Sequence, residues 1–484
     1  MCRTKRPDYE KTEVLKPPGR VHLMGICGTG MGSLAGLFLE AGYRVTGSDQ
    51  AAYPPMSDYL GRLGIRVMEG YDAGNLDEAP DLVVVGNVIR RSNPEAAALE
   101  KSGIAFVTMP EAITRYFAWD KTRIVITGTH GKTTVSSMIA WILHSTGMDP
   151  GFMIGGIPGN FGKSCRAGLG PYFVIEGDEY DTAYFEKTPK FLHYHPKLTV
   201  ITSCELDHVD IYANIEDIRS QFRRLVESMP DDGFILYYGD DPTLRNIVRG
   251  SAPVSESYGL RDDNDWIVRN GGLNGRGLIT SVIRRGIKQA EGNLPVLGTH
   301  NLLNASAAVA VANRIGISAS AAVKALASFK GVHRRQEIAA DEGGLTVVDD
   351  FAHHPTAVKA TVDAVKARYP ERRLVAVFEP RTNSSRRSVF QEDYAGAFPR
   401  ADVIVVREPR DVAHIPPEDR FSAARLTEAL RSEGKEAVFF DDTEGITAFL
   451  GAELRRGDVV LVMSNGNFDG LVTRLVSTAK ERAA

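Results

Sequence analysis

The 484-residue sequence has few cysteines, no long apolar run and no large excess of either charge. Its cysteines (Cys2, Cys27, Cys165 and Cys204) are too far apart for a CxxC pair or a zinc spacing, which indicates reduced thiols. No apolar stretch approaches the roughly 20 residues of a membrane span, and the N-terminus lacks the apolar core of a signal peptide. The formal net charge of −4 gives no general attraction to nucleic acid or acidic lipid. We therefore predict a cytoplasmic protein without nucleic-acid or membrane partners.

The most informative stretch that is present runs from Arg123 to Leu143. A β-branched run leads into Gly128-Thr129-His130-Gly131-Lys132-Thr133-Thr134, and a helical pattern follows. This order of strand, glycine loop and helix start is typical of a phosphate-binding loop. Lys132 is expected to reach the outer phosphates of a nucleoside triphosphate, and the Thr133 hydroxyl to ligate the accompanying Mg²⁺. Ile126 stands where the usual eight-residue form has glycine, so the loop is a tighter variant.

A second glycine loop lies near the N-terminus, with the spacing Gly25-x-x-Gly28-x-Gly30-x-Gly32. A strand ending at Asp49 follows about 20 residues after it, as in dinucleotide-binding folds. The spacing departs from G-x-G-x-x-G, however, so the evidence for NAD is weak. The loop equally suits another diphosphate, such as a nucleotide sugar, on the N-terminus of the helix.

Two further apolar strands end in acidic residues. Residues 172–175 run into Glu176-Gly-Asp178-Glu179, and residues 198–202 precede Asp207-His208. Because the carboxyl ends of neighbouring parallel strands share one crevice, we expect these side chains to gather beside Lys132 and Thr133. Carboxylates there would supply the oxygen ligands that Mg²⁺ prefers.

The alternation of strands and helices predicts an α/β protein with three successive open-sheet domains, as the length also suggests. We expect a Rossmann-like domain at 20–119, a P-loop central domain at 120–332 and a Rossmann-like domain at 333–484. Residues 231–290 read as a strand-rich excursion. The third domain is expected to be an open parallel sheet, with polar strand ends at Asp349-Asp350, Glu379 and Ser464.

These motifs, in this order, resemble the Mur ligases of peptidoglycan synthesis over nearly the whole chain after residue 20. The resemblance rests on Thr127-Gly-Thr-His-Gly-Lys-Thr-Thr134, Glu176-Gly-Asp-Glu179, Asp207-His-Val-Asp210, His300-Asn-x-x-Asn304, Arg334-Arg335 and Asp349-Asp-Phe-Ala-His-His-Pro355. Within the family, the chain is similar to the branch that takes UDP-N-acetylmuramate. The run from Glu176 to Tyr194, with Phe378-Glu-Pro-Arg381-x-Asn383 and Met463-Ser-Asn-Gly466, resembles the recycling ligases that add L-alanyl-γ-D-glutamyl-meso-diaminopimelate. The L-alanine-adding ligases are expected to have Glu-Ala-Asp-Glu-Ser-Asp instead.

The resemblance implies an ATP-dependent amide ligase that uses Mg²⁺ and proceeds through an acyl phosphate. Lys132, Glu176, His208 and Arg335 are expected to be catalytic, and Thr133, Glu176 and His208 to ligate metal. ATP binding is assigned to residues 128–134 with Asn301, Arg335 and Asp350. The UDP-sugar site is assigned to Gly28, Thr29, Gly30, Met31, Asp49 and Ser92, and the acceptor site to Arg381, Asn383, Ser384, Ser464 and Asn465.

Three alternatives stay open beside this interpretation. An L-alanine-adding ligase would have the same fold and donor, an NAD-dependent oxidoreductase would use only the first glycine loop, and a nucleotide-driven switch would lack ligase chemistry. For Asp49, a strand-end cap is as good an explanation as a ligand contact. The carbamylated lysine of several Mur ligases is absent, because no lysine lies between Lys197 and Lys288. The sequence makes no prediction of oligomeric state.

Overall fold

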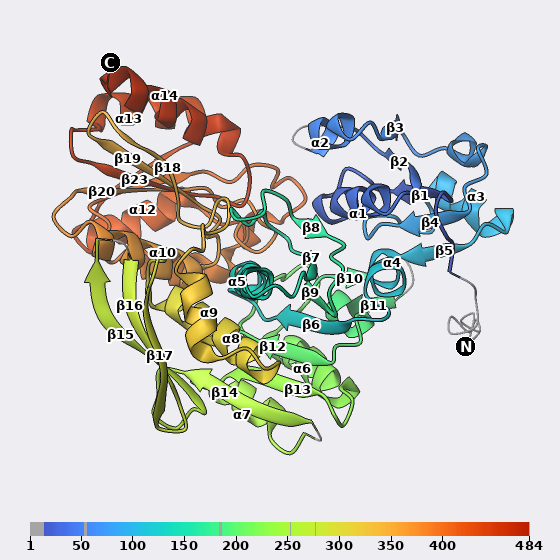
Figure 1. The fold of residues 1–484 in the computed structure, drawn as a ribbon. Helices are drawn as coiled ribbons and strands as arrows, with labels where there is room; N and C mark the ends of the chain where they lie inside the picture. Colours follow the sequence, from blue (N-terminus) through green and yellow to red (C-terminus); the bar gives the residue numbers. More distant parts are fainter. Residues whose placement is uncertain (1–13, 53–55, 183–185, 252, 276, 484) are drawn as a thin grey trace.

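The computed structural model describes residues 14–483 except 53–55, 183–185, 252 and 276. The polar N-terminal arm up to residue 13, with Cys2, and residues 183–185 of the Glu176–Tyr194 motif lie outside the described residues. Three large sheets follow one another along the chain, each with helices packed against it (Figure 1). Among the described residues, no helix is both long and apolar enough to cross a bilayer.

The first sheet is parallel, with the strand order β3-β2-β1-β4-β5. Helices α1, α2 and α4 cover one face, and their core is continuous with that of the central domain, whereas α3 covers the other face. Its strands are β1 (Arg20–Met24), β2 (Arg44–Asp49), β3 (Arg66–Glu69), β4 (Leu82–Val85) and β5 (Phe106–Thr108), and its helices are α1 (Thr29–Glu40), α2 (Met56–Arg62), α3 (Pro94–Ser102) and α4 (Met109–Phe117).

The second sheet has the order β17-β16-β15-β14-β13-β12-β6-β9-β7-β8, and β6 lies between β12 and β9. Both acidic strand ends are therefore direct neighbours of the phosphate loop that follows β6. The strands near the site are β6 (Thr122–Thr127), β7 (Gly151–Met153), β8 (Cys165–Arg166), β9 (Tyr172–Glu176) and β12 (Leu198–Ile201). Helices α5 (Lys132–Ser145), α8 (Thr299–Arg314) and α9 (Ala319–Leu326) cover one face, and α6 (Ile215–Ser228) covers the other.

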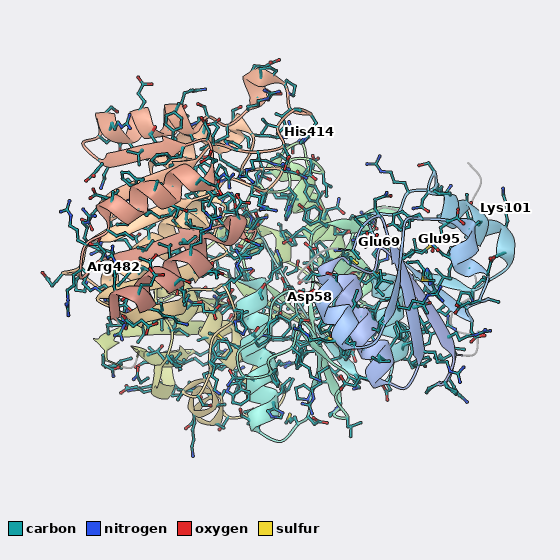
Figure 2. All side chains as sticks on the ribbon, turned by 90° about the horizontal axis from the view of Figure 1, so that it is seen from above. Asp58, Glu69, Glu95, Lys101, His414 and Arg482 are labelled. Atoms are coloured by element: carbon teal, nitrogen blue, oxygen red, sulfur yellow. The ribbon has the colours of Figure 1, made fainter. Side chains whose placement is uncertain are left out.

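The third sheet has the order β18-β19-β23-β20-β21-β22, and apolar cores lie on both of its faces. Its strands are β18 (Glu337–Glu342), β19 (Leu345–Asp350), β20 (Leu374–Phe378), β21 (Val403–Arg407), β22 (Glu436–Phe440) and β23 (Val459–Met463). Its helices are α10 (Pro355–Arg368), α11 (Gln391–Ala395), α12 (Ala423–Ser432), α13 (Thr443–Glu453) and α14 (Leu471–Ala483). Seen from above, the labelled Glu95 of the first domain and Arg482 of the third lie on opposite sides of the molecule (Figure 2).

Two expectations about the sheets were wrong in detail. Residues 231–290 are not an excursion, because β13 (Phe234–Tyr238) and β14 (Val254–Gly259) extend the central parallel sheet. The sheet then continues into β15 (Trp266–Asn274), β16 (Gly277–Arg284) and β17 (Ile287–Leu294), of which β16 and β17 run antiparallel to their neighbours. The third sheet is not wholly parallel, since β18 pairs antiparallel with β19 at its edge. The domain boundaries stay predictions.

Candidate active site

The phosphate loop is shaped by two glycines with positive φ. Gly128 (φ 118°) lies so close to the next strand that a Cβ would be 2.4 Å from the Thr202 hydroxyl oxygen. Gly131 (φ 82°) begins α5, and a Cβ there would be 2.6 Å from Asn304 Oδ1. Only glycine fits at both positions, so the backbone can wrap closely around an anion at the N-terminus of α5.

Lys132 is the charged centre of the loop, and its partner is Glu179. Its ammonium donates to Glu179 Oε2 at 2.7 Å and to the Gly128 carbonyl at 2.8 Å. The two side chains are 12% and 5% exposed. Burial works to lower the pKa of Lys132, but Glu179 and Asp178 raise it above its ordinary value. Lys132 is thus held fully charged where the outer phosphates of a nucleotide are expected.

Thr133 lies between an acidic strand end and an arginine from the start of the third domain. Its hydroxyl donates to Glu176 Oε1 at 3.0 Å, and the other carboxylate oxygen of Glu176 accepts from the Gly155 amide at 2.7 Å. The Arg335 guanidinium reaches the Thr133 hydroxyl at 3.4 Å. A hydroxyl and a carboxylate at this spacing form the oxygen donor set that suits Mg²⁺.

A second acidic group lies beside the first and contains His208. One ligand atom each from Asp178, Glu179 and His208 lies within 4.8 Å of the others, whereas Glu176 is not in this group. The Lys190 ammonium donates to Asp178 Oδ2 at 3.0 Å. Burial works to raise the pKa of Asp178, but Lys190 and Lys132 lower it far below its ordinary range. The expected metal ligands Glu176 and His208 are therefore parts of two adjacent groups.

Residues near the start of the third domain link it to the central domain around the expected nucleotide position. Arg335 lies over the Phe351 ring, with its central carbon 4.5 Å from the ring centroid. Asp350 accepts from the backbone amides of Gln336 and Ala352, and burial raises its pKa although Arg335 opposes this. Asn301 on α8 donates to Gln336 Oε1 at 3.1 Å. Asn301 and Asp350 thus both contact Gln336, which directly follows Arg335, and their shared assignment to ATP stays a prediction.

Two of the expected acceptor residues, both from the third domain, contact the central domain. Asn383 donates to Asp210 Oδ2 at 2.9 Å, and the Val209 amide donates to the Ser384 hydroxyl at 3.3 Å. Ser464 and Asn465 follow β23, and the Ser464 hydroxyl donates to Glu379 Oε2 at 2.6 Å. Arg381 is 51% exposed and 3.9 Å from Glu379. Asn383 and Ser384 thus border the domain junction beside His208, where both already have partners.

In the first domain, the carboxylate of Asp49 is occupied by its own loop. Asp49 Oδ2 accepts from the Cys27 amide at 2.8 Å, and Tyr71 donates to Oδ1 at 3.3 Å. These contacts favour the strand-end cap over a ligand contact. Gly28, Thr29, Gly30 and Met31 form the start of α1, where amides point outward, and Ser92 is exposed just before the α3 cap Asn93.

Two residues that the sequence reasoning did not assign contribute to the site. Lys190 neutralises Asp178, and Gln336 connects Asn301 to the Asp350 carboxylate. Lys190 belongs to the Lys-Phe-x-His-Tyr run that carried the family resemblance, so its position in that run was a usable signal. Gln336 directly follows the paired arginines, but no pattern in the sequence distinguishes it from a surface glutamine.

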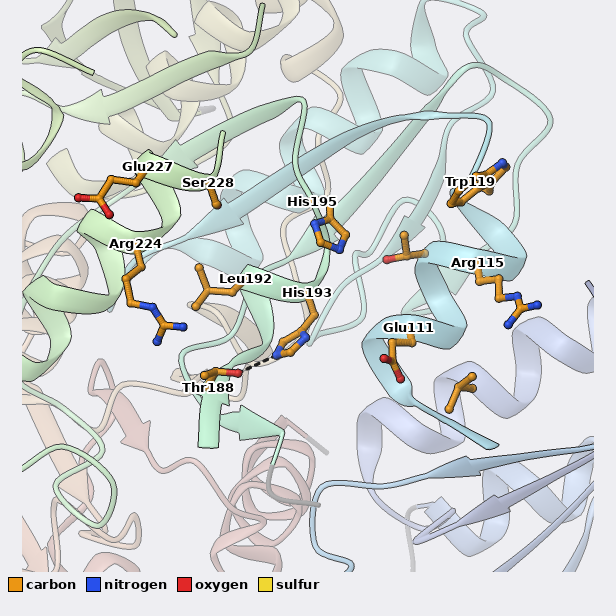
Figure 3. Close-up of a pocket in the computed structure, with 12 residues that line it drawn as sticks. Glu111, Arg115, Trp119, Thr188, Leu192, His193, His195, Arg224, Glu227 and Ser228 are labelled. Carbon is orange, nitrogen blue, oxygen red and sulfur yellow. Dashed lines mark hydrogen bonds between the residues drawn. The ribbon is translucent and has the colours of Figure 1, made fainter. Parts of the chain in front are cut away.

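A cavity of about 570 Å³ lies elsewhere, between α4 of the first domain and the short helix at Lys190–His193 (Figure 3). Trp119, His193, His195 and Arg224 are among its lining residues. None of the predicted site residues lines it, and it lacks the Lys132 carboxylate cluster. The catalytic site is therefore expected at the carboxyl ends of the central strands, beside Lys132, and not in this cavity.

Comparisons with known protein families match most of the chain. The family described as Mur ligase family, catalytic domain, matches residues 20–118; the Mur ligase middle domain matches 126–312; and the Mur ligase, glutamate ligase domain, matches 334–466. The central match contains the phosphate loop and both acidic strand ends.

Full-length relatives show the same similarity. The chain is 37% identical, over 96% of its length and 99% of the relative, to the UDP-N-acetylmuramate–L-alanyl-γ-D-glutamyl-meso-2,6-diaminoheptandioate ligase of Escherichia coli. It is 33% identical, over 93% of its length and 95% of the relative, to the UDP-N-acetylmuramate–L-alanine ligase of Clostridium acetobutylicum. The crystal structure of a murein peptide ligase from Psychrobacter arcticus superposes with a TM-score of 0.70 at 33% identity, covering 95% of this chain and 98% of that one.

Proposed function

Because the chain belongs to the Mur ligase family, we propose that it is an ATP-dependent ligase that joins UDP-N-acetylmuramate to L-alanyl-γ-D-glutamyl-meso-diaminopimelate. The observation that carries the proposal is the convergence of Lys132, Glu176 and Arg335 on Thr133 and its loop, in a chain that is 37% identical to a ligase of this specificity. ATP is the nucleotide expected for the loop, and a triphosphate needs both cationic donors and a metal ion there.

The proposed reaction converts a poor electrophile into a good one. The carboxylate of UDP-N-acetylmuramate takes the γ-phosphoryl group of ATP and becomes an acyl phosphate, with ADP as leaving group. The free α-amine of the tripeptide attacks the acyl carbon, and phosphate leaves from the tetrahedral intermediate. The protein mainly positions the reactants and balances charge, as in other phosphoryl transfers.

Each group of the site has a part in this proposal. Lys132 would move from Glu179 to the β- and γ-phosphates, and Arg335 would approach the same phosphates from the third domain. Thr133 and Glu176 fit Mg²⁺, since both present oxygens within 3.0 Å of each other. The bound ion would offset phosphate charge. His208, with Asp178 and Glu179, would hold a second metal ion, and Lys190 limits the net charge of that group.

The choice of acceptor is supported by Gly177 and by the relatives. A Cβ at Gly177 would be 2.7 Å from Val125 Cγ1 and 3.0 Å from Phe191 Cβ, so alanine cannot replace this glycine without movement. Glu-Gly-Asp-Glu and the Lys-Phe-x-His-Tyr run are thus packed against each other as one unit. The two tripeptide-ligase relatives are 37% and 34% identical over 96% and 95% of the chain, against 31–33% for five alanine ligases.

We place this reaction in peptidoglycan recycling in the cytoplasm, and through it in cell-wall biogenesis, cell shape and cell division. The UDP-sugar would lie on the glycine loop at the start of α1, as the expected site residues require. An NAD site at this loop is disfavoured, because Asp49 would have to leave the Cys27 amide to reach a ribose.

The test is phosphate release from purified protein with UDP-N-acetylmuramate, ATP and Mg²⁺, with either L-alanine or the tripeptide as acceptor. We expect turnover with the tripeptide and a ligated product of the corresponding mass. Turnover with L-alanine alone would assign the chain to the alanine-adding branch. ATP hydrolysis that needs no UDP-N-acetylmuramate would instead support the nucleotide switch.

A further inference from the structure

A second cluster of metal-ligating side chains lies on the other side of the phosphate loop from Glu176. His130 belongs to the loop itself, Glu205 follows β12, and His354 caps the N-terminus of α10 in the third domain. One ligand atom from each lies within 4.8 Å of the other two. The cluster therefore joins the central and third domains, and none of its members belongs to the Asp178–Glu179–His208 group.

The distances within this cluster are long for hydrogen bonds but suit a metal. Glu205 Oε2 lies 3.4 Å from His130 Nε2 and 3.6 Å from His354 Nδ1. Charge-assisted hydrogen bonds are typically about 2.7–2.9 Å long. Ligands about 2.0–2.1 Å from a tetrahedral ion are about 3.3–3.4 Å apart, which is close to both distances.

The hydrogen bonds of His354 also leave a ring lone pair facing the Glu205 carboxylate. The Thr356 amide donates to His354 Nδ1 at 3.3 Å, which places the ring proton on Nε2. Nδ1 thus has no proton to offer Glu205, and a cation would relieve the repulsion.

The surroundings resemble the partners that usually orient metal ligands. His354 Nε2 lies 3.2 Å from the Leu206 carbonyl oxygen, and the Thr356 hydroxyl donates to Glu205 Oε2 at 2.7 Å. Such contacts fix the ring tautomer and the carboxylate of a metal site. Glu205 and His354 line a cavity of about 490 Å³, which leaves room for a water as a fourth ligand. Among the described residues, only the Thr356 amide, at 3.3 Å, competes for Nδ1.

We propose that His130, Glu205 and His354 bind a divalent transition metal such as Zn²⁺ or Co²⁺, at a position separate from the Mg²⁺ site of Thr133 and Glu176. Two imidazoles and one carboxylate favour such an ion over Mg²⁺, which prefers oxygen ligands. Since His354 comes from the third domain, the bound ion fastens that domain to the phosphate loop. This proposal does not depend on the identity of the acceptor.

The test titrates the full chain, freed of metal by a chelator, with Co²⁺ in an excess of Mg²⁺. We expect one equivalent to bind and to produce the intense visible bands of tetrahedral Co²⁺. His354→Asn keeps a helix-capping oxygen but removes the metal ligand. It should weaken Co²⁺ binding by at least about tenfold, because the loss of only a hydrogen-bond partner of a ligand already weakens metal binding by at least about that factor. Glu205→Gln is the second variant, in case the first folds poorly.

His208→Asn is the matched control, because it alters the only other such cluster among the described residues. The tetrahedral bands should be unchanged in this variant. Bands that disappear in His208→Asn but remain in His354→Asn would overturn the proposal, because the ion would then belong to the Asp178–Glu179–His208 group. An absence of tetrahedral bands in the unaltered chain would overturn it as well and leave a hydrogen-bonded cluster only.

Discussion

Lys132 shows how one side chain can be fixed before its ligand arrives. Its ammonium has both a carboxylate partner, Glu179, and a carbonyl partner in its own loop, Gly128. The side chain is therefore oriented toward the phosphate position and does not need to be ordered by the nucleotide, which lowers the entropic cost of binding. The groups that raise the pKa of Lys132, namely Glu179, Asp178 and Glu176, are all acidic.

The first prediction concerns this charge. Lys132→Ala should lower ATP-dependent ligation by about 10²–10³-fold or more, the usual loss when a donor to developing charge is removed. Binding of UDP-N-acetylmuramate, measured by calorimetry on the full chain, should persist because its loop lies in the first domain. Lys288→Ala, which alters an exposed lysine, is the control and should ligate normally. Near-normal ligation by Lys132→Ala would mean that the phosphate loop has been misinterpreted.

His300 should give the stability of the protein a measurable pH dependence. Burial, with a smaller contribution from His130, lowers the pKa of His300 to about 4, while in the unfolded chain it is about 6.5. Between these values the unfolded chain holds a proton that the folded protein lacks. Stability should therefore rise with pH across this window, by at most about 1.4 kcal/mol per pH unit for one group, and this contribution should be constant above it.

The measurement compares urea unfolding of the unaltered protein and of His300→Asn at pH 5 and pH 7. The difference between the two pH values should shrink in the variant. His414→Asn, at an exposed position, is the control and should leave that difference unchanged. An equal pH dependence in His300→Asn would show that His300 takes up its proton without cost in the folded state.

At the scale of elements, the buried strands were predictable, whereas the two edge strands of the third sheet, β18 and β22, were not. The apolar runs at β1, β6, β9, β12, β19, β20 and β23 are nearly continuous, as parallel strands buried on both faces must be. β18 reads Glu-Ile-Ala-Ala-Asp-Glu and β22 reads Glu-Ala-Val-Phe-Phe, and both are partly exposed. Their identity as strands depends on neighbours far away in the chain, which local patterns do not contain.

The candidate site was predictable for a related reason. Strand order places Glu176 and Asp178 beside the loop of β6, so acidic strand ends could be assigned to one crevice. The sequence left the Asp49 cap and a ligand contact equally open, because loop geometry decides between them. The Asn383–Asp210 contact was not predictable, because it depends on how two domains meet. The Glu205–His354 pair was missed for the same reason, since its members lie on different domains.

β21 ends in a buried charge that ties three elements of the third domain together. Arg407 is completely buried and donates to Thr443 at the start of α13 at 2.6 Å and to Asp469, after β23, at 2.7 Å. Arg407→Leu takes the buried cation away from the buried Glu379 carboxylate, 3.5 Å from it, whereas Asp469 keeps Arg410 at 2.7 Å. We expect a loss of about 3–5 kcal/mol, as for other broken buried pairs.

Hydrogen-exchange mass spectrometry of peptides covering 403–407 and 459–463 would measure this loss locally, without assuming that three domains unfold together. Arg425→Leu is the matched control, because Arg425 and Glu392 form a pair that is 63% and 85% exposed. That change should cost less than about 1 kcal/mol. Equal protection in Arg407→Leu and the unaltered protein would show that the cluster adds no net stability.

At the scale of the whole molecule, residues 331–336 connect the central and third domains and have the features of a hinge. The His333 amide donates to the Ile157 carbonyl on the central side, whereas Arg334 donates to the Ser464 carbonyl on the other. Arg334 (φ 58°) and Gln336 (φ 55°) both have left-handed backbone, which is uncommon for such residues. A short segment held at both ends and strained between them can absorb a rotation of one domain.

We accordingly expect the third domain to close further over the central domain when ligands bind. Small-angle scattering should show a smaller radius of gyration with UDP-N-acetylmuramate and a non-hydrolysable ATP analogue than without them, because the nucleotide needs contacts from both domains. Scattering with UDP-N-acetylmuramate alone serves as the control, since the first domain holds that ligand. An unchanged radius with both ligands present would mean that the closed arrangement already prevails in solution.

The Lys132–Glu179 pair has a consequence for the order in which substrates bind. Nucleotide binding is an exchange of counter-ions, because phosphate takes the lysine and sets the Glu179 carboxylate free. The carboxylate joins Asp178 and His208 beside the junction that Asn383 and Ser384 border. The region around Asp178, Glu179 and His208, which was electrically neutral, thus becomes anionic only after ATP has bound. It then attracts an amine or a metal ion. The Lys132–Glu179 pair thus makes the charge on the acceptor side of the cleft depend on nucleotide binding. The pair therefore influences the order of substrate binding, with ATP before the acceptor, as well as the geometry of the site.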